Sequence, residues 1–332
     1  DPHLISIDAE PGRPDADFGT AGRASVAHGL PYVEPLKNYA MNSSPVVVRN
    51  VIIAGANIAD RPLMKEQPRG DIFGFDARTG KKLWTFHAVP RPGEFGYDTW
   101  EDGSAEYTGN TNVWSLITVD EETGYVYLPF GTPTNDFYGG HRPGHNLFAE
   151  SLVCLDATTG KRVWHFQGVH HGLWDYDFPA APNLVDLVVN GRPVKAVAQV
   201  SKQGFVYVFD RKTGQPIWPI DERPVPASTV PGERAAAAQP FPTAPPPFDR
   251  QGFLDSDVID FTPELRAQAL DALKSWDRGP LFTPPSVRGT VQMPGDVGGA
   301  DWGGAGVDPD SGFLYVTSVT SPTIVGLDRG DE

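Results

Sequence analysis

A short segment that recurs along this chain of 332 residues limits its fold more than any other feature. In each copy an apolar run leads to an aspartate, then to a Thr-Gly pair, and then to a tryptophan. The copies are GFDARTGKKLWTF (74–86), CLDATTGKRVWHF (154–166) and VFDRKTGQPIWPI (208–220). A weaker copy at 4–12 keeps Asp8 and Gly12 but has no tryptophan. Such repeats indicate that one structural unit is used several times.

Turn chemistry predicts that each copy is a β-hairpin. The aspartate side chain can accept hydrogen bonds from backbone N–H groups of the turn, and the glycine can adopt a positive φ. A second class of hairpin is predicted at 119–129 and 307–317, and the intervals between copies fit blades of about 40–50 residues with insertions. We therefore expect an all-β fold, a β-propeller in which each tryptophan packs between neighbouring sheets. A β-sandwich with similar turns is the alternative.

Composition agrees with this architecture and excludes several functions. The 36 glycines and 33 prolines indicate many turns and few long helices. The formal net charge of -15 argues against nucleic acid and anionic lipid as partners. We expect no transmembrane segment, and the single Cys154 excludes an internal disulfide or a cysteine-based zinc cluster. The chain opens with Asp-Pro and no initiator Met, so we expect that a signal peptide or a further domain preceded residue 1.

One region departs from the repeats. Residues 221–250 are rich in proline and alanine, which predicts an extended surface excursion. Residues 262–276 then predict a helix with Thr262 as N-cap, Pro263 in its first turn and an apolar stripe that packs on the core. We therefore expect a single domain over 1–332, a partial propeller, with the excursion and short helix of 221–280 inserted within it.

The segment HHGLWDYDFP (170–179) carries the strongest chemical signal. In an extended strand Asp175 and Asp177 would project to the same side, about 6 to 7 Å apart. Two carboxylates in a partly dry site need a proton or a cation between them, and a hard, oxygen-binding cation is the simpler solution. His170 and His171 are either contacts for a ligand or structural residues.

These motifs together resemble the quinoprotein dehydrogenases. The Asp-x-x-Thr-Gly-x-x-x-Trp unit is similar to the tryptophan-docking motif of that family, and VHHGLWDYD, KQGFVYVFDRKTG, GPLFTPPS and GGADWGGAGVDP resemble the sugar and alcohol branch that includes membrane-bound glucose dehydrogenase. The resemblance implies an eight-bladed propeller of which about five blades are present. It also implies pyrroloquinoline quinone (PQQ) and Ca²⁺, Mg²⁺ or a lanthanide as cofactors.

The resemblance assigns roles to residues around the Trp-Asp-x-Asp motif. Asp175 corresponds to the catalytic base beside the metal, and Asp177 to an added metal ligand. Lys202 corresponds to the basic residue that points at the quinone oxygens, both catalytic and cofactor-binding. Trp114 lies where the family stacks a tryptophan on the PQQ ring. Solvated carboxylates, an exposed lysine and an ordinary core tryptophan are the corresponding alternatives.

Four further positions complete the predicted site. The segment GANIAD (55–60) implies Asp60 as the acidic metal ligand, with Glu66 as an alternative, and Asn57 as a cofactor contact. Thr132 occupies the place of a metal-binding asparagine in the methanol branch. Trp302 is the last predicted cofactor contact, and it follows Asp301, where related sequences more often have asparagine.

The implied activity is oxidation of an alcohol or aldose hydroxyl, with metal-assisted hydride transfer to the quinone. The implied partners are a small alcohol or sugar and a quinone or cytochrome c electron acceptor, and the implied location is the periplasm. Two other interpretations compete with this one. The chain could be a non-catalytic propeller scaffold that binds proteins, or Asp175 and Asp177 could be a glycosidase pair, although such carboxylates normally come from separate elements.

Overall fold

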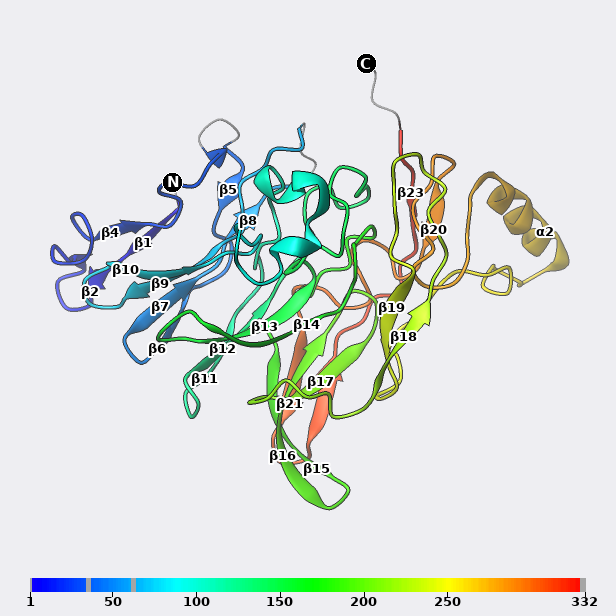
Figure 1. Ribbon diagram of the computed structural model, residues 1–332. Coiled ribbons are helices and arrows are strands. Elements are labelled where there is room, and N and C mark those ends of the chain that lie inside the picture. The colour runs from blue at the N-terminus through cyan, green and yellow to red at the C-terminus, as the bar shows by residue number, and fades with distance from the viewer. Residues whose placement is uncertain (1, 34–36, 61–63, 329–332) are drawn as a thin grey trace.

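The computed structural model describes residues 2–33, 37–60 and 64–328 of the chain. Antiparallel sheets follow one another across the molecule from the N-terminal pair β1–β4 to the hairpin β18–β19 (Figure 1). The fold is a β-propeller, as the repeats predicted. Within the described residues, two sheets have four strands, one has three, and the remaining strands pair in twos.

The three larger sheets contain the tryptophan repeats. The first, β6-β7-β9-β10, comprises Val46–Val48, Val51–Ala54, Ile72–Asp76 and Lys82–Phe86. The second, β11-β12-β13-β14, comprises Thr118–Asp120, Tyr125–Pro129, Ser151–Asp156 and Arg162–Gln167. The third, β15-β16-β17, comprises Asn183–Val189, Arg192–Val200 and Val206–Asp210.

Shorter pairs and helices complete the described chain. The pairs are β1 (His3–Ile5) with β4 (Arg23–Ser25), β2 (Ile7–Asp8) with β3 (Arg13–Pro14), β5 (Tyr39–Ala40) with β8 (Asn57–Ile58), β18 (Ile220–Pro224) with β19 (Ala238–Pro242), β20 (Thr290–Gln292) with β23 (Thr323–Val325), and β21 (Ala305–Asp308) with β22 (Phe313–Val316). The helices are α2 (Pro263–Ala272) and the 3₁₀ turns η1 (Tyr97–Thr99), η2 (Glu101–Glu106) and η3 (Leu273–Ser275). No helix in the described ranges is long and apolar enough to cross a bilayer.

The repeat turns have the chemistry that the sequence predicts. In the second copy, Asp156 Oδ1 accepts hydrogen bonds from the Thr159 backbone N–H (2.8 Å) and hydroxyl (2.9 Å). Gly160 closes the turn by donating to the Asp156 carbonyl at 2.8 Å, with φ of +69°. The first and third copies repeat these bonds around Asp76 and Asp210.

Tryptophans join each repeat to the next. Trp84 of the first sheet donates from Nε1 to the Ala157 carbonyl of the second sheet's turn at 3.1 Å, and its ring lies directly on Gly160. Trp164 in turn donates to the Arg211 carbonyl of the third sheet's turn at 3.2 Å and lies on Gly214. The predicted packing of tryptophans between neighbouring sheets is therefore confirmed for these two copies.

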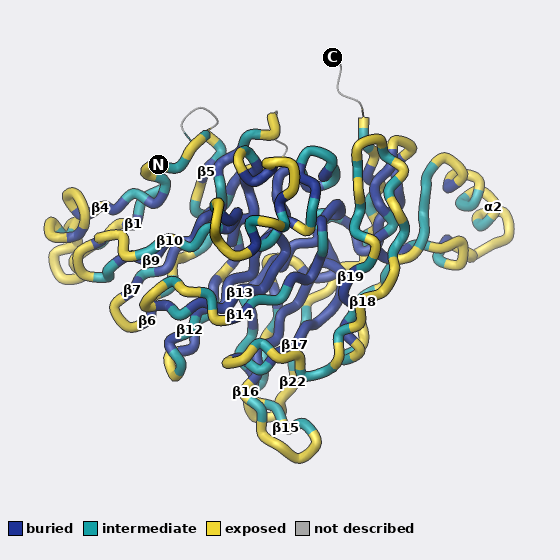
Figure 2. Tube along the Cα trace, in the orientation of Figure 1, coloured by how far each residue is buried: buried dark blue, intermediate teal, exposed yellow. Residues whose placement is uncertain are grey.

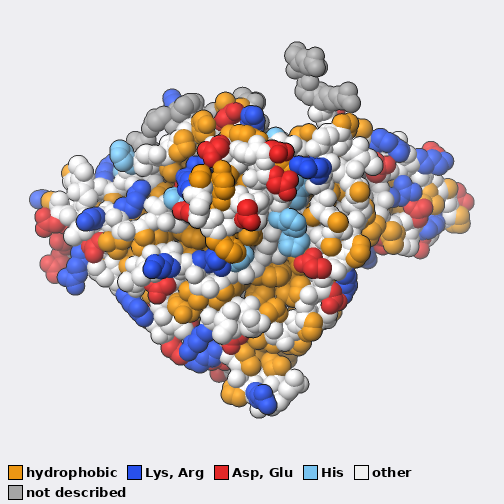
Figure 3. Space-filling view, viewed as in Figure 1, with side chains coloured by type: hydrophobic (Ala, Val, Ile, Leu, Met, Phe, Trp, Pro, Cys, Tyr) orange, Lys and Arg blue, Asp and Glu red, His pale blue; other side chains and the backbone are white. Residues whose placement is uncertain are grey.

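The cores lie between the sheets. One cluster joins the first two sheets through residues such as Ile53, Ile72 and Val153, and another joins the second and third through Tyr127 and Tyr207. Buried backbone is concentrated in these inner strands, whereas the outer turns are exposed (Figure 2). Acidic and basic side chains are interspersed over the visible face, with hydrophobic side chains between them (Figure 3).

The Pro-rich region is more ordered than the sequence predicted. Its first residues pair with residues 238–242 as the hairpin β18–β19, in which the Gln239 side chain is fully buried. Thr262 caps α2 by accepting from the Leu265 N–H at 3.2 Å, as predicted. The predicted core stripe is only partly right, because Leu273 is buried in a small satellite cluster whereas Leu265 is 40% exposed. This helix projects from the body of the propeller (Figure 1).

Candidate active site

A cavity of about 310 Å³ contains nearly all of the predicted site residues. Its lining comes from segments of the chain that lie far apart: Asn42, Asn57, Ile58, Asp60, Asn110, Asn112, Trp114, Thr132, Asp136, Asp175, Asp177, Lys202, Asp296, Val297 and Asp301. Trp302 lies outside this lining and is 51% exposed, whereas its neighbour Asp301 lines the cavity. A larger open groove of about 660 Å³ near β1 and β6 contains none of the predicted residues, so the chemistry belongs to the smaller cavity.

Lys202 provides the positive charge between the two predicted carboxylates. Its Nζ lies 3.0 Å from Asp175 Oδ2 and 3.3 Å from Asp177 Oδ2. Burial lowers the pKa of Lys202, but the carboxylates of Asp177 and Asp175 outweigh burial and raise it overall. The lysine therefore stays protonated. The sequence predicted a proton or a cation between Asp175 and Asp177, and the Lys202 ammonium group supplies at least part of that positive charge.

The local backbone differs from the extended strand assumed above. Residues 172–179 form no strand, and Asp175 has a left-handed φ of +55°. Successive side chains still alternate, because Asp175 and Asp177 line the cavity whereas Trp174 and Tyr176 are buried outside it. Trp174 and Tyr176 donate to the carbonyls of Thr283 (2.9 Å) and Pro294 (2.6 Å). These aromatic anchors hold the segment so that Asp175 and Asp177 line the cavity.

Asp177 connects the other predicted residues. Its Oδ2 accepts from Trp114 Nε1 at 3.0 Å, and its Oδ1 accepts from the Thr132 hydroxyl at 2.7 Å and from the Thr132 backbone N–H. Lys202 Nζ lies 5.8 Å from the centre of the Trp114 ring, within the range of a cation–π contact. Both oxygens of Asp177 are thus hydrogen-bonded within the protein, so this residue orients Trp114 and Thr132.

Asp60 and Asn57 line another part of the same cavity. Asp60 Oδ1 accepts from Asn110 Nδ2 at 3.3 Å, and Asn57 lies on β8. Glu66, the alternative to Asp60, is not among the lining residues. The structure therefore favours Asp60 over Glu66.

Two buried carboxyl groups at the site were not singled out from the sequence. Asp136 lines the cavity with 7% exposure, and burial together with the nearby Asp60 and Asp177 carboxylates raises its pKa to about 7. Glu150 is fully buried; burial and the Asp177 carboxylate raise its pKa to about 8, and its Oε1 lies 3.5 Å from the Thr132 hydroxyl. Neither residue belongs to a recognisable motif, so only the tertiary structure places them here.

The cavity residues partly fit a flat, anionic cofactor. Their carboxylate oxygens are also the donor type that a hard cation prefers. The Trp114 ring on the cavity wall offers a π surface, and Lys202 offers a cation. Several carboxylates share this single lysine, which favours a further cation. In the part of the chain that the structure describes, however, no group of three or more His, Cys, Asp or Glu side chains is arranged to hold a metal ion. The assignment of Asp60, Thr132, Asp175 and Asp177 as metal ligands stays a prediction.

The paired histidines contact protein groups instead. His170 Nε2 lies 3.1 Å from Glu222, and its backbone exchanges two hydrogen bonds with Gln239, at 2.8 and 2.7 Å. His171 Nε2 lies 2.6 Å from Glu233. Both histidines therefore bind the excursion, which corresponds to the structural alternative.

Comparison with known proteins identifies the family. Residues 1–332 match the family model described as PQQ "Glucose/ethanol/alcohol dehydrogenase, beta-propeller domain", and the chain belongs to this family. Quinoprotein glucose dehydrogenase A of Acinetobacter calcoaceticus is 32% identical over 100% of this chain and 41% of its own length. The glycerol dehydrogenase large subunit of Gluconobacter oxydans is 34% identical over 97% of this chain and 43% of its own length. Quinate/shikimate dehydrogenase (quinone) of Acinetobacter baylyi is 32% identical over 96% of this chain and 39% of its own length.

Solved structures support the fold. The quinohemoprotein alcohol dehydrogenase ADHIIG of Pseudomonas putida superposes with a TM-score of 0.67 at 23% identity, over 99% of this chain and 42% of its own. A europium-containing methanol dehydrogenase gives a TM-score of 0.62 at 20% identity, over 96% of this chain and 49% of its own. The chain thus spans about 40% of the length of the curated relatives that it matches.

Proposed function

We propose that this chain forms part of a PQQ-dependent dehydrogenase that oxidises the hydroxyl group of an alcohol or aldose to the aldehyde or lactone. The observation that carries the proposal is the convergence of Trp114, Asp175 and Lys202 on one cavity in a member of this family. A bound PQQ would supply the two-electron acceptor, and a bound cation would supply Lewis acidity. The glycosidase alternative lacks support, because Asp175 and Asp177 come from one segment and share Lys202.

The chain's own residues have distinct tasks in this proposal. Asp175 accepts the hydroxyl proton, because its carboxylate lines the cavity and 23% of its side chain is exposed. Lys202 holds Asp175 Oδ2 in place and provides positive charge where negative charge develops. Trp114, fixed by Asp177, presents its ring to the cofactor.

Hydrogen-bond acceptors are abundant in the cavity. Six aspartates line it, and Lys202 is the only cation among its described lining residues. These carboxylates offer many acceptors to the hydroxyl groups of a sugar or alcohol. We therefore propose a substrate of the class named in the glucose and glycerol relatives.

The metal, acceptor and location are further parts of the proposal. We propose Ca²⁺, Mg²⁺ or a lanthanide as the metal, a quinone or cytochrome c as the electron acceptor, and a periplasmic location. These parts rest on family membership. The scaffold alternative accounts for the tryptophan repeats but gives no reason for the cavity's charged residues.

Asp175→Asn tests the catalytic assignment. In the complete gene product, loaded with PQQ and with Ca²⁺, Mg²⁺ or La³⁺, we expect dye-linked turnover of a neutral polyol to fall about 100-fold or more, because the amide cannot accept the proton. PQQ binding, followed by absorbance titration, is expected to persist. Asp186→Asn, at an exposed position on β15, is the matched control. Retention of substantial turnover by Asp175→Asn would exclude this residue as the base.

A further inference from the structure

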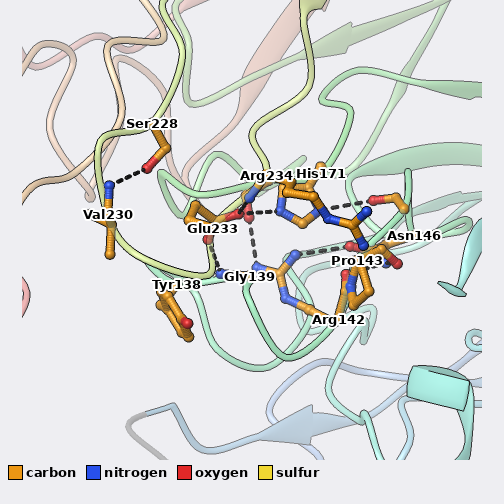
Figure 4. Close-up of polar contacts among 12 residues, drawn as sticks. Tyr138, Gly139, Arg142, Pro143, Asn146, His171, Ser228, Val230, Glu233 and Arg234 are labelled. Atoms are coloured by element: carbon orange, nitrogen blue, oxygen red, sulfur yellow. Dashed lines mark hydrogen bonds and ion pairs between the residues drawn. The ribbon is translucent and has the colours of Figure 1, made fainter. Parts of the chain in front are cut away.

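A buried charged cluster outside the cavity joins three segments of the chain (Figure 4). Its members are Arg142, which is fully buried, and the His171 and Glu233 side chains, which are 3% and 2% exposed. Glu233 comes from the loop 225–237 at the tip of the hairpin β18–β19. Burial of these ionic groups is unfavourable unless each is fully paired, so the contacts within the cluster need an explanation.

Glu233 bonds to two different segments at once. Its Oε1 lies 2.6 Å from His171 Nε2, and its Oε2 accepts from the Gly139 backbone N–H (Figure 4). Burial raises the pKa of Glu233, but His171, the hydrogen bond from the Gly139 N–H and the charge of Arg142 together outweigh burial and lower the pKa below its usual value. His171 Nδ1 lies 2.8 Å from the Gly144 carbonyl, so both ring nitrogens face oxygen acceptors.

Arg142 links the same two segments a second time. Its guanidinium donates to the carbonyls of Thr134 (3.1 Å), Asn135 (2.7 Å) and Gly172 (2.7 Å). Thr134 and Asn135 belong to the loop that carries Thr132 and Asp136 into the cavity, and Gly172 precedes the segment that carries Asp175 and Asp177.

We propose that Glu233 is a positioning residue of the active site. Through His171 and Gly139 it sets the spacing of the two loops that carry the cavity carboxylates. Gly139 lies three residues after Asp136, and His171 lies four residues before Asp175, so the clamp acts close to both groups. The excursion therefore stabilises the cavity wall from outside, through contacts of its loop 225–237 with the two cavity loops. A simpler role, in which Glu233 only anchors its own loop, would leave the two cavity loops unaffected by its loss.

The test uses Glu233→Ala and Glu233→Gln in the complete gene product. Glu222→Gln is the matched control, because Glu222 lies on the same hairpin and pairs with His170 at 3.1 Å but is 56% exposed. The readouts are backbone hydrogen exchange over 131–146 and 168–177, and the Kd for PQQ at a temperature where every variant is folded. The exchange readout does not depend on PQQ and decides the proposal even if the wild-type protein binds none.

We expect Glu233→Ala to exchange about tenfold faster or more in both cavity segments. We expect Glu233→Gln to be intermediate, because its amide oxygen can still accept from His171, and Glu222→Gln to match the wild type. PQQ, if bound, should bind about tenfold more weakly to Glu233→Ala. Faster exchange confined to 225–237 would overturn the proposal, and so would global unfolding of both Glu233 variants, which would make the residue a general stabiliser.

Discussion

Single residues at this site perform more than one task. Asp177 accepts hydrogen bonds from Trp114 and Thr132 and also lies 3.3 Å from Lys202, so one carboxylate links the aromatic wall, the polar wall and the lysine. Asp175, by contrast, is bonded through Oδ2 to Lys202 and keeps part of its side chain exposed. Identical side chains two positions apart therefore differ in role because their surroundings differ.

Lys202→Met should reveal how much the shared ammonium stabilises the site. In the metal-free and cofactor-free protein we expect the free energy of unfolding to fall by about 3 kcal/mol, because removing one partner of a buried ion pair leaves the other uncompensated. Lys195→Met, which removes a half-exposed partner of Glu122, should cost about 1 kcal/mol or less. Urea unfolding at pH 7 measures both. Equal losses in the two variants would mean that Asp175 and Asp177 do not need the lysine charge.

His165 should contribute to acid sensitivity. Its ring packs against Phe95 and Phe148 at centroid distances of 5.5 and 5.2 Å, and burial together with Arg162 lowers its pKa to about 4. The unfolded state, with a pKa of about 6.5, then binds more protons between pH 6.5 and 4, so stability should fall as the pH falls through this range.

We expect His165 to account for about 1–2 kcal/mol of the loss between pH 7 and 5. His165→Asn cannot titrate but can still accept from Arg162, so its stability should depend less on pH over this interval. Thermal unfolding at a series of pH values measures the slope. An unchanged slope in His165→Asn would rule out this residue as a contributor.

At the scale of elements, the repeat unit is both a hairpin and a joint between sheets. Its aspartate and threonine form the turn, its glycine leaves room for a ring, and the tryptophan of the preceding repeat fills that room. The same nine positions therefore specify local structure and the packing of the next sheet.

Comparing Gly160→Ala with Gly191→Ala should separate the cost of backbone strain from the cost of disturbing the tryptophan contact. Its φ of +69° disfavours alanine, and a Cβ would lie 2.5 Å from the Trp84 ring. Gly191 has a similar φ of +76°, but a Cβ there would meet no other atom within 4 Å, so Gly191→Ala isolates the backbone strain. We expect a loss of about 1 kcal/mol for Gly191→Ala and about 3 kcal/mol for Gly160→Ala in denaturant unfolding. Similar losses would show that the tryptophan contact contributes little.

At the scale of the whole molecule, residues from many separate segments of the propeller line one cavity. Its lining extends from Asn42 to Asp301, yet the three larger sheets between these positions follow one another in simple antiparallel order. Loops at one end of successive sheets can thus meet without any long-range strand crossing. Family membership explains the repeats, and the excursion braces the cavity from outside the sheets.

Local patterns determined much of this protein from its sequence. The hairpins, the tryptophan joints and the helix cap were predictable because Asp, Thr, Gly and Trp interact within a few residues or with the next copy of the same motif. Most of the predicted site residues also share one cavity. The extended conformation at Asp175 and the core contact of Leu265 were predicted incorrectly, because neighbouring packing decides which side chains turn inward. The role of Trp302 as a cofactor contact stays a prediction.

Only the tertiary structure decided the partners of the buried polar groups. Trp114 and Asp177 are 63 residues apart, His171 and Glu233 are 62 apart, and Gly139 and Glu233 are 94 apart. Asp136 and Glu150 belong to no motif, and their burial among other charges becomes visible only when the loops have converged. Turn formation is a short-range property of the chain, whereas the pairing of a buried charge depends on which distant segments exclude water around it.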